Sequence, residues 1–271
     1  MKPAITTGFN YKIPFYQEIS MIRQAGFEVV SLGARPTHSG YDTAEGRKII
    51  RKIIEQNGIQ IDSVHAPFPE GDKLFSIDEN ERLESINQCK LAIDAALEIG
   101  GKIVVIHLIS YGIPDGDTKQ KMIEQGFGSV KTLTEHAIDK NVKLALENGQ
   151  KQDYDSVLSQ LLIEFSDVSV GFCYDSGHEN VQGACFNILE KFGHRLLTTH
   201  LHDNLGSDTH LLPYEGNIDW KRFREIVHSI NYSGNLLLES DMKNSKFREP
   251  EQFLSEARRQ IETLLHAPDK N

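Results

Sequence analysis

Residues 196–220, LLTTHLHDNLGSDTHLLPYEGNIDW, join an apolar segment of strand length to a run of imidazole and carboxylate side chains. His200 and His202 are expected on one face of this strand, because successive side chains of a strand point to opposite faces. The polar run contains His200, His202, Asp203, Asp208 and His210. An ordinary polar loop would explain any one of these residues. Together they indicate a site for zinc, manganese or iron, since imidazole and carboxylate ligands suit these metals.

Around this stretch, apolar segments of strand length alternate eight times with longer segments of helical period. The expected strands are 4–9, 27–32, 59–66, 102–108, 143–148, 168–175, 196–203 and 235–240. The expected helices are 14–25, 44–57, 79–99, 118–140, 153–165, 180–192, 219–230 and 250–266. Four of the helices run into glycines that are expected to stop them with positive φ, namely Gly26, Gly58, Gly100 with Gly101, and Gly193. No linker interrupts the alternation. The pattern predicts an α/β fold in which residues 1–271 form a single (β/α)8 TIM barrel domain, with a doubly wound open sheet as the alternative.

Composition narrows the classes of partner. The formal net charge of −10 provides no general attraction to nucleic acid or to an anionic membrane, so a small polar substrate is favoured. No segment approaches the roughly 20 apolar residues that span a bilayer, and the first residues do not resemble a signal peptide, so a cytoplasmic location is expected. Cys89, Cys173 and Cys185 lack metal-binding spacing and are expected to be reduced thiols.

An ionisable residue stands near the end of each of the last six expected strands. These residues are His65, His107, Glu147, Asp175, His200 and Glu239. In a barrel the carboxyl ends of the strands meet at one mouth, where active sites of this fold lie. Each residue alone could have a structural role. Burying all of them together without a cation would be unfavourable, so the set as a whole favours a metal centre.

Two short motifs add further candidate ligands. Asp175-Ser-Gly-His178 follows the sixth strand, with Gly177 expected to allow a sharp turn, and Asp208-Thr-His210 follows the seventh. The candidate metal ligands are therefore His65, His107, Glu147, Asp175, His178, His200, Asp208, His210 and Glu239. This set exceeds the needs of one ion. Either two or three metal ions, or one ion beside a histidine-lined substrate pocket, would account for these residues. His202 and Asp203 are interpreted as residues that orient the ligands.

The order and context of these residues resemble the xylose isomerase-like TIM barrels, a superfamily that includes sugar-phosphate isomerases and epimerases, ketose 3-epimerases, inosose dehydratases and endonuclease IV. The resemblance rests on the segments ALEN, YDSGH, HLHD, LPYEGNIDW and LLLES, in that order. It implies that the family's metal core lies at Glu147, Asp175, His200 and Glu239. Endonuclease IV uses nine ligands for three zinc ions, and all nine matching positions are filled here.

The sequence departs from the family pattern at two places. Tyr214 occupies a position where the family usually has Gly, and no Arg follows His200 closely, as one does in the ketose epimerases. In addition, the loops after the first two strands are short and offer Arg35 and little else that is basic. Endonuclease IV uses loops of this kind to bind DNA, so the short loops here weigh against a DNA-cleaving activity.

The resemblance implies a metal-dependent isomerase or epimerase of a small sugar, sugar phosphate or cyclitol, acting through an enediolate. One to three zinc or manganese ions would bind the substrate oxygens. The expected catalytic residues are Glu147 and Glu239, as general base and acid, and His178, which would move a proton on the substrate oxygen. The main alternative is hydrolysis of abasic-site DNA at three zinc ions, which the full ligand set favours and the acidic charge opposes. A barrel that only binds a sugar or metal is the third hypothesis. The sequence leaves open the substrate, the metal and whether the chain forms a homo-oligomer.

Overall fold

Eight parallel strands form one sheet in the computed structural model, which describes residues 1–183 and 185–266. The strands are Pro3–Thr6 (β1), Val29–Leu32 (β2), Gln60–His65 (β3), Ile103–Ile106 (β4), Lys143–Glu147 (β5), Val170–Asp175 (β6), Leu196–His200 (β7) and Leu236–Leu238 (β8). Their order is β7-β6-β5-β4-β3-β2-β1-β8, so consecutive strands are paired along the sheet, and β7 and β8 form its two ends.

A bridge between the two end strands brings the sheet round into a near-closed barrel. Leu201, directly after β7, pairs in parallel with Leu238 of β8. The Leu201 N–H donates to the Leu237 carbonyl at 2.8 Å, and the Glu239 N–H donates to the Leu201 carbonyl at 3.0 Å. The expected (β/α)8 barrel is therefore confirmed, and the open doubly wound alternative is wrong. Closure also brings His200 and Glu239, from opposite ends of the strand order, to one mouth.

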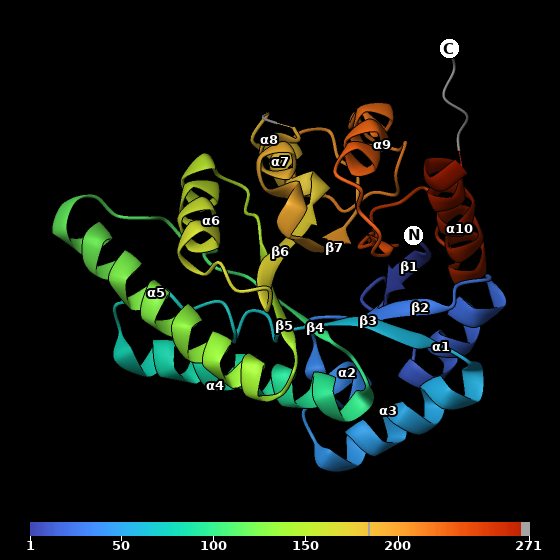
Figure 1. The fold of residues 1–271 in the computed structure, drawn as a ribbon. Helices are drawn as coiled ribbons and strands as arrows, with labels where there is room; N and C mark the ends of the chain where they lie inside the picture. The colour runs from blue at the N-terminus through green and yellow to red at the C-terminus, as the bar shows by residue number, and fades with distance from the viewer. Residues whose placement is uncertain (184, 267–271) are drawn as a thin grey trace.

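The helices lie outside the strands, with the two longest, α4 and α5, side by side (Figure 1). The helices are Phe15–Gln24 (α1), Pro36–Ser39 (α2), Ala44–Asn57 (α3), Glu79–Ile99 (α4), Gly116–Asp139 (α5), Gln152–Glu164 (α6), Ser176–Val181 (α7), Asn187–Phe192 (α8), Trp220–Ser229 (α9) and Pro250–His266 (α10), with a 3₁₀ helix at Gly193–Arg195 (η1). The short α2 between β2 and α3 was not expected from the sequence. No described helix is both long and apolar enough to cross a membrane.

Local sequence accounts for most helix ends. The Thr43 and Asp78 side chains accept hydrogen bonds from first-turn N–H groups of α3 and α4, and so begin these helices. Gly58 and Gly100 end the same two helices in the left-handed conformation, with φ of 61° and 87°. The expectation for Gly193 is wrong, because its φ is −52° and it opens η1 instead of stopping a helix in the left-handed region.

The expected single helix 180–192 is also wrong. The chain forms α7 directly after β6 and then α8, with Gly183 at φ 71° and Phe186 at φ 73° between them. Asp175 begins α7 by accepting a hydrogen bond from the His178 N–H at 2.7 Å. This side chain therefore starts the helix several residues before the expected position, because it caps the backbone as soon as the strand ends.

The strands are buried on both faces, as expected for a covered parallel sheet. Inside the barrel, Val105, Ala145 and Cys173 form a small apolar layer beneath the mouth. All three cysteines are free thiols; Cys89 and Cys173 are buried, and Cys185 is half-buried. A compact floor thus closes the barrel below the polar residues that follow the strands.

Candidate metal centre

A cavity of about 560 Å³ opens at the mouth, and seven of the nine expected ligands line it. The other two, Asp175 and His200, lie deeper, and their exposed fractions are 0% and 1%. Eight of these nine residues, together with His202, offer ligand atoms in three close groups, two of which share Glu147 and His200. The barrel topology thus brings together residues from six strand ends that span most of the chain.

The first group consists of His65, Glu147 and His200, and His107 lies beside it next to Glu147. His65 Nε2 lies 3.5 Å from Glu147 Oε2, and His107 Nε2 lies 3.2 Å from the same oxygen. The two imidazole rings meet edge to face, with centroids 4.8 Å apart. Two ring nitrogens therefore face one carboxylate oxygen at the wall of the cavity.

The second group contains Glu147, Asp175, His200 and Glu239, which offer four ligand atoms within 4.8 Å of one another. His200 Nδ1 lies 3.3 Å from Glu147 Oε1 and 3.2 Å from Glu239 Oε2. Glu147 therefore faces His65 and His107 with one oxygen and His200 with the other. A carboxylate in this position can bridge two cations.

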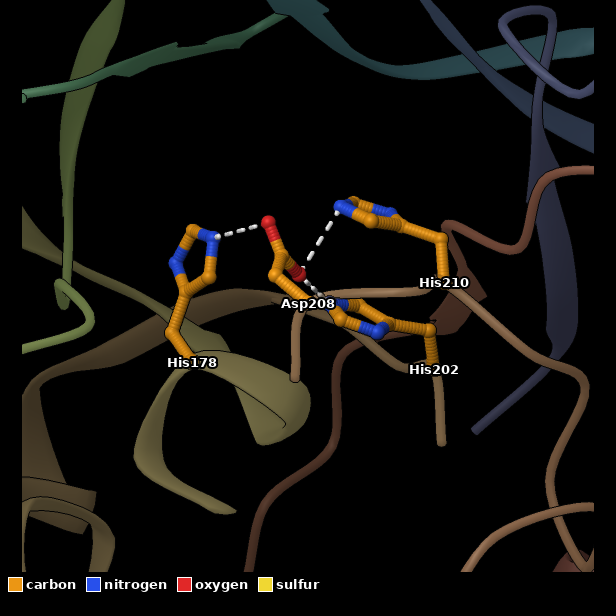
Figure 2. A group of neighbouring side chains, drawn as sticks. All are labelled: His178, His202, Asp208 and His210. Carbon is orange, nitrogen blue, oxygen red and sulfur yellow. Dashed lines mark ion pairs between the residues drawn. The ribbon is translucent and has the colours of Figure 1, made fainter. Parts of the chain in front are cut away.

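The third group contains His178, His202, Asp208 and His210, whose ligand atoms also lie within 4.8 Å of one another (Figure 2). Asp208 stands between the rings. Its oxygens lie 3.2 Å from His210 Nε2 and 3.8 Å from the Nε2 atoms of both His178 and His202. Three imidazoles and one carboxylate form a donor set that suits zinc.

Backbone carbonyl groups fix the orientation of three of the histidines. Nδ1 of His65 donates to the Ala66 carbonyl at 2.8 Å, that of His178 to the Asn148 carbonyl at 2.9 Å, and that of His210 to the Glu239 carbonyl at 2.7 Å. A carbonyl can only accept, so Nδ1 carries the proton and Nε2 of the neutral ring presents its lone pair to the group. This second hydrogen bond is typical of metal-binding histidines.

Buried polar atoms without partners support the fit to metal. Among the described residues, neither oxygen of Glu147 has a hydrogen-bond partner, nor does Nδ1 of His200 or of His202. The side chain of Glu147 is only 1% exposed. Leaving a buried carboxylate unpaired is costly, so the donor set fits divalent cations in place of the missing partners.

The charges of the groups depend on one another. Burial favours the neutral form of Glu147, yet the His200 and His107 rings hold the pKa of this carboxyl well below its usual range. Burial also opposes the charge on Glu239, and His200 lowers the pKa of Glu239 to about 2. Burial opposes the charge on His210, whereas Asp208 raises the pKa of His210 to about 10. Protons on the histidine rings thus offset the negative charges of the carboxylates, and bound cations would displace those protons.

His202 and Asp203 occupy different places. His202 Nε2 lies 3.0 Å from Asp175 Oδ1, as expected of a residue that orients a ligand, but its ring also belongs to the third group. Asp203 faces away from the groups. It accepts hydrogen bonds from the Tyr214 and Ile218 N–H groups and from the Trp220 indole N–H, and so holds the loop before α9.

Gly177 has a role other than the expected sharp turn. It lies within α7, and a Cβ atom built there would stand 1.9 Å from His202 Cε1. The absence of a side chain therefore allows the His202 ring to pack against the helix. The expectation of a turn is wrong because Gly177 is helical, in the first turn of the helix that Asp175 caps.

Sequence reasoning missed the loop that follows β5. The Asn148 amide donates to the Asp175 carbonyl at 2.9 Å and accepts from the Asp175 N–H at 2.6 Å, which ties the ends of β5 and β6 together. The Gln150 amide donates to Asp208 at 2.8 Å. Their position directly after Glu147 in the ALENGQ segment was the one available signal.

Comparison with known proteins identifies the family of this chain. The sequence model of the family described as "Xylose isomerase-like TIM barrel" matches residues 19–264. The chain belongs to this family. A relative from Sinorhizobium fredii (strain NBRC 101917 / NGR234), the uncharacterized protein y4fM, is 30% identical over 253 residues, which covers 83% of this chain and 80% of the relative.

Solved structures of this fold superpose over nearly the whole chain. A D-tagatose 3-epimerase-like protein has a TM-score of 0.81 at 20% identity, covering 98% of this chain and 97% of that one. The 3-keto-D-glucoside 4-epimerase YcjR from E. coli has a TM-score of 0.79 at 16% identity, with coverage of 97% and 99%. At sequence identities of 20% and 16%, these similarities establish the fold alone.

Within the xylose isomerase-like barrel, the departure at Tyr214 has a conformational meaning. Its φ is 68°, in the left-handed region that favours glycine. The Tyr214 N–H donates to Asp203 at 3.0 Å, which holds the residue in this conformation. The loop therefore keeps the backbone path that a glycine would adopt, and it adds a half-exposed phenol.

Proposed function

We propose that this protein is a metal-dependent isomerase or epimerase of a small sugar, sugar phosphate or cyclitol. The observation that carries the proposal is the pair of carboxylates that flank His200, Glu147 at 3.3 Å and Glu239 at 3.2 Å, at the floor of a cavity large enough for a sugar. Two carboxylates on either side of one point suit the removal and return of a carbon-bound proton.

The second group would hold the essential zinc or manganese ion through Glu147, Asp175, His200 and Glu239. Such an ion, when bound, stabilises negative charge that develops on neighbouring substrate oxygens and so favours an enediolate. Glu239 has the better access to substrate, because 18% of its side chain is exposed against 1% for Glu147. We assign Glu239 and Glu147 to proton transfer at carbon, and His178, which also lines the cavity, to a substrate oxygen.

The names of the structural neighbours support the substrate class. One is a D-tagatose 3-epimerase-like protein and another a 3-keto-D-glucoside 4-epimerase, so proteins with this barrel act at different carbons of different sugars. Their low identity means that they suggest a sugar epimerase without indicating which sugar or stereocentre is used here.

One observation favours a second candidate function, hydrolysis of abasic-site DNA. The third group, around Asp208, adds a further set of ligand atoms beside the first two, which matches the three-zinc arrangement implied by the resemblance to endonuclease IV. A one-metal sugar enzyme does not require this group. The short loops after β1 and β2 and the net charge of −10 oppose the nuclease.

Solvent exchange distinguishes the two functions. We expect the zinc- or manganese-loaded protein to introduce deuterium from D₂O into a ketose at the carbon beside its carbonyl, because an enediolate exposes that carbon to exchange. Mass spectrometry and proton NMR of a panel of ketoses and their phosphates would detect the label. Strand cleavage of an abasic duplex, with no exchange into any member of the panel, would reject the isomerase in favour of the nuclease.

A further inference from the structure

The charge on the cavity wall has a simple distribution. Three carboxylates line the cavity, those of Glu147, Asp208 and Glu239, and all three belong to the candidate metal groups. Among the described residues that line it, Lys151 is the only lysine or arginine. Once cations neutralise the three carboxylates, the remaining formal charge on the wall is that of Lys151.

Lys151 is exposed and is held in place by an aromatic ring. Its Nζ atom lies 5.4 Å from the centroid of Tyr154, a cation–π contact. The Tyr154 hydroxyl donates to the Tyr111 carbonyl at 2.8 Å, and the residue is only 6% exposed, so the ring is fixed. Lys151 forms no ion pair with any described carboxylate. This cavity-lining residue therefore has no carboxylate counter-ion among the described residues.

The loop that carries Lys151 is tied to the metal groups. The Gly149 N–H donates to Asp155 at 3.0 Å, and its carbonyl accepts from the Gln182 amide at 2.7 Å. The Gln150 amide donates to Asp208 at 2.8 Å. These bonds fix the backbone path from Glu147 to Lys151, so the lysine side chain leaves the loop at a defined place beside the groups.

A neighbouring groove of about 850 Å³ provides a contrast. It shares Glu239 and His210 with the cavity and carries Arg35, which lies 4.6 Å from the centroid of Tyr11. However, three carboxylates outside the metal groups also line this groove, those of Asp42, Glu70 and Asp241. Its second cation, Lys243, is paired with Asp241 at 2.6 Å. An anion is therefore favoured in the cavity and not in this groove.

We infer that Lys151 binds an anionic substituent of the substrate, a phosphate or a carboxylate, at the end away from the reacting carbon. The inference rests on the proposed function in taking a sugar as the molecule that enters the cavity and bound metal as what neutralises its carboxylates. A lysine supplies a mobile point charge that suits either anion. Such an anion site narrows the substrate class from sugars in general to sugar phosphates or sugar acids.

Binding of three matched probes tests this site. D-Fructose, D-fructose 6-phosphate and D-fructuronate differ in the group at one end, and calorimetry on the zinc-loaded protein measures the affinity of each. We expect at least one anionic probe to bind tighter than D-fructose by about tenfold or more. Lys151→Met should reduce this preference to about threefold or less. Arg35→Met is the matched control, an exposed cation over a tyrosine ring in the other groove, and it should keep the preference.

Three results would overturn the assignment: no preference for either anion in the native protein, a preference that survives Lys151→Met, or an equal loss in Arg35→Met. A preference that survives Lys151→Met would mean that the metal groups, and not Lys151, bind the anion. The measurement needs no turnover, so it is separable from the exchange experiment. Exchange without anion preference rejects the Lys151 site alone, whereas anion preference without exchange rejects the isomerase alone.

Discussion

Glu239 and His210 lie on the same side of the mouth, yet they belong to different groups of ligand atoms. In a sugar isomerase, Glu239→Gln should reduce the exchange rate by about 10²–10⁴-fold, because it removes a proton acceptor while keeping the side-chain shape. His210→Ala should reduce it far less, since the second group does not contain this ring. Exchange rates and metal content of both variants, measured together, separate lost chemistry from lost metal. Equal and mild losses in both would indicate a barrel that binds without catalysis.

Glu18, on α1, is a buried carboxyl without a hydrogen-bond partner among the described residues. Its exposed fraction is 0%, neither oxygen has a hydrogen-bond partner among the described residues, and His38 Nε2 is 3.8 Å away and bonded to the Ile13 carbonyl. Burial raises the pKa of Glu18 from 4.5 to about 10. The folded state therefore keeps a proton that the unfolded chain releases above its ordinary pKa. Stability should be fully present below pH 4.5 and be lost as the pH rises toward about 10.

Glu18→Gln removes this titration while keeping the shape of the side chain. At pH 8 the variant should be more stable than the native protein by about 1–3 kcal/mol, and the two should be nearly equal at low pH. Urea unfolding in the presence of a chelator at several pH values measures the difference. Parallel stability curves for the two proteins would show that Glu18 is not held neutral by burial.

At the scale of elements, the junction of β6 and α7 positions two ligands at once. Asp175 caps α7, and the bare backbone at Gly177 admits the His202 ring, which stacks on His210 with centroids 3.8 Å apart. Gly177→Ala would place a Cβ atom 1.9 Å from His202 Cε1 and must displace that ring. We expect weaker metal binding at the third group by about 10–100-fold, as for loss of a residue that orients a ligand.

Gly128→Ala is the matched control for this variant. Gly128 also lies within a helix, α5, and a Cβ atom there would meet nothing within 4 Å. Alanine should stabilise that helix by roughly 0.5–1 kcal/mol and leave metal binding unchanged. Elemental analysis and zinc competition titrations of both variants provide the measurement. Native zinc affinity in Gly177→Ala would mean that His202 takes no part in the third group.

At the scale of the whole molecule, net charge separates the candidate functions. A nuclease must contact several phosphates, and each one steepens the fall of log affinity with log salt by about 0.9. A chain of net charge −10 with short loops after β1 and β2 should show no measurable binding to an abasic duplex at physiological salt. Fluorescence anisotropy across a salt series checks this. Tight, salt-sensitive binding would favour the three-zinc nuclease over the sugar enzyme.

Much of this architecture follows from local sequence. Strand-length apolar segments, helical periodicity and stops such as Gly58 predicted the barrel, because these signals act over a few residues. The ligand residues were predictable for a related reason. In a parallel barrel every strand ends at the same mouth, so a residue such as Glu147 at a strand end is placed by topology alone.

Other features required the tertiary structure, because they depend on contacts between distant segments. His202 joins the group around Asp208 because Gly177, on another element, leaves room for its ring. Lys151 lines the cavity on a loop that Gln150 and Gly149 tie to Asp208 and Gln182, which are far along the chain. Periodicity and spacing determined which residues reach the mouth. Packing between elements decided which of these residues share a ligand group and which charged residue lies beside the groups. No local sequence pattern encodes this packing.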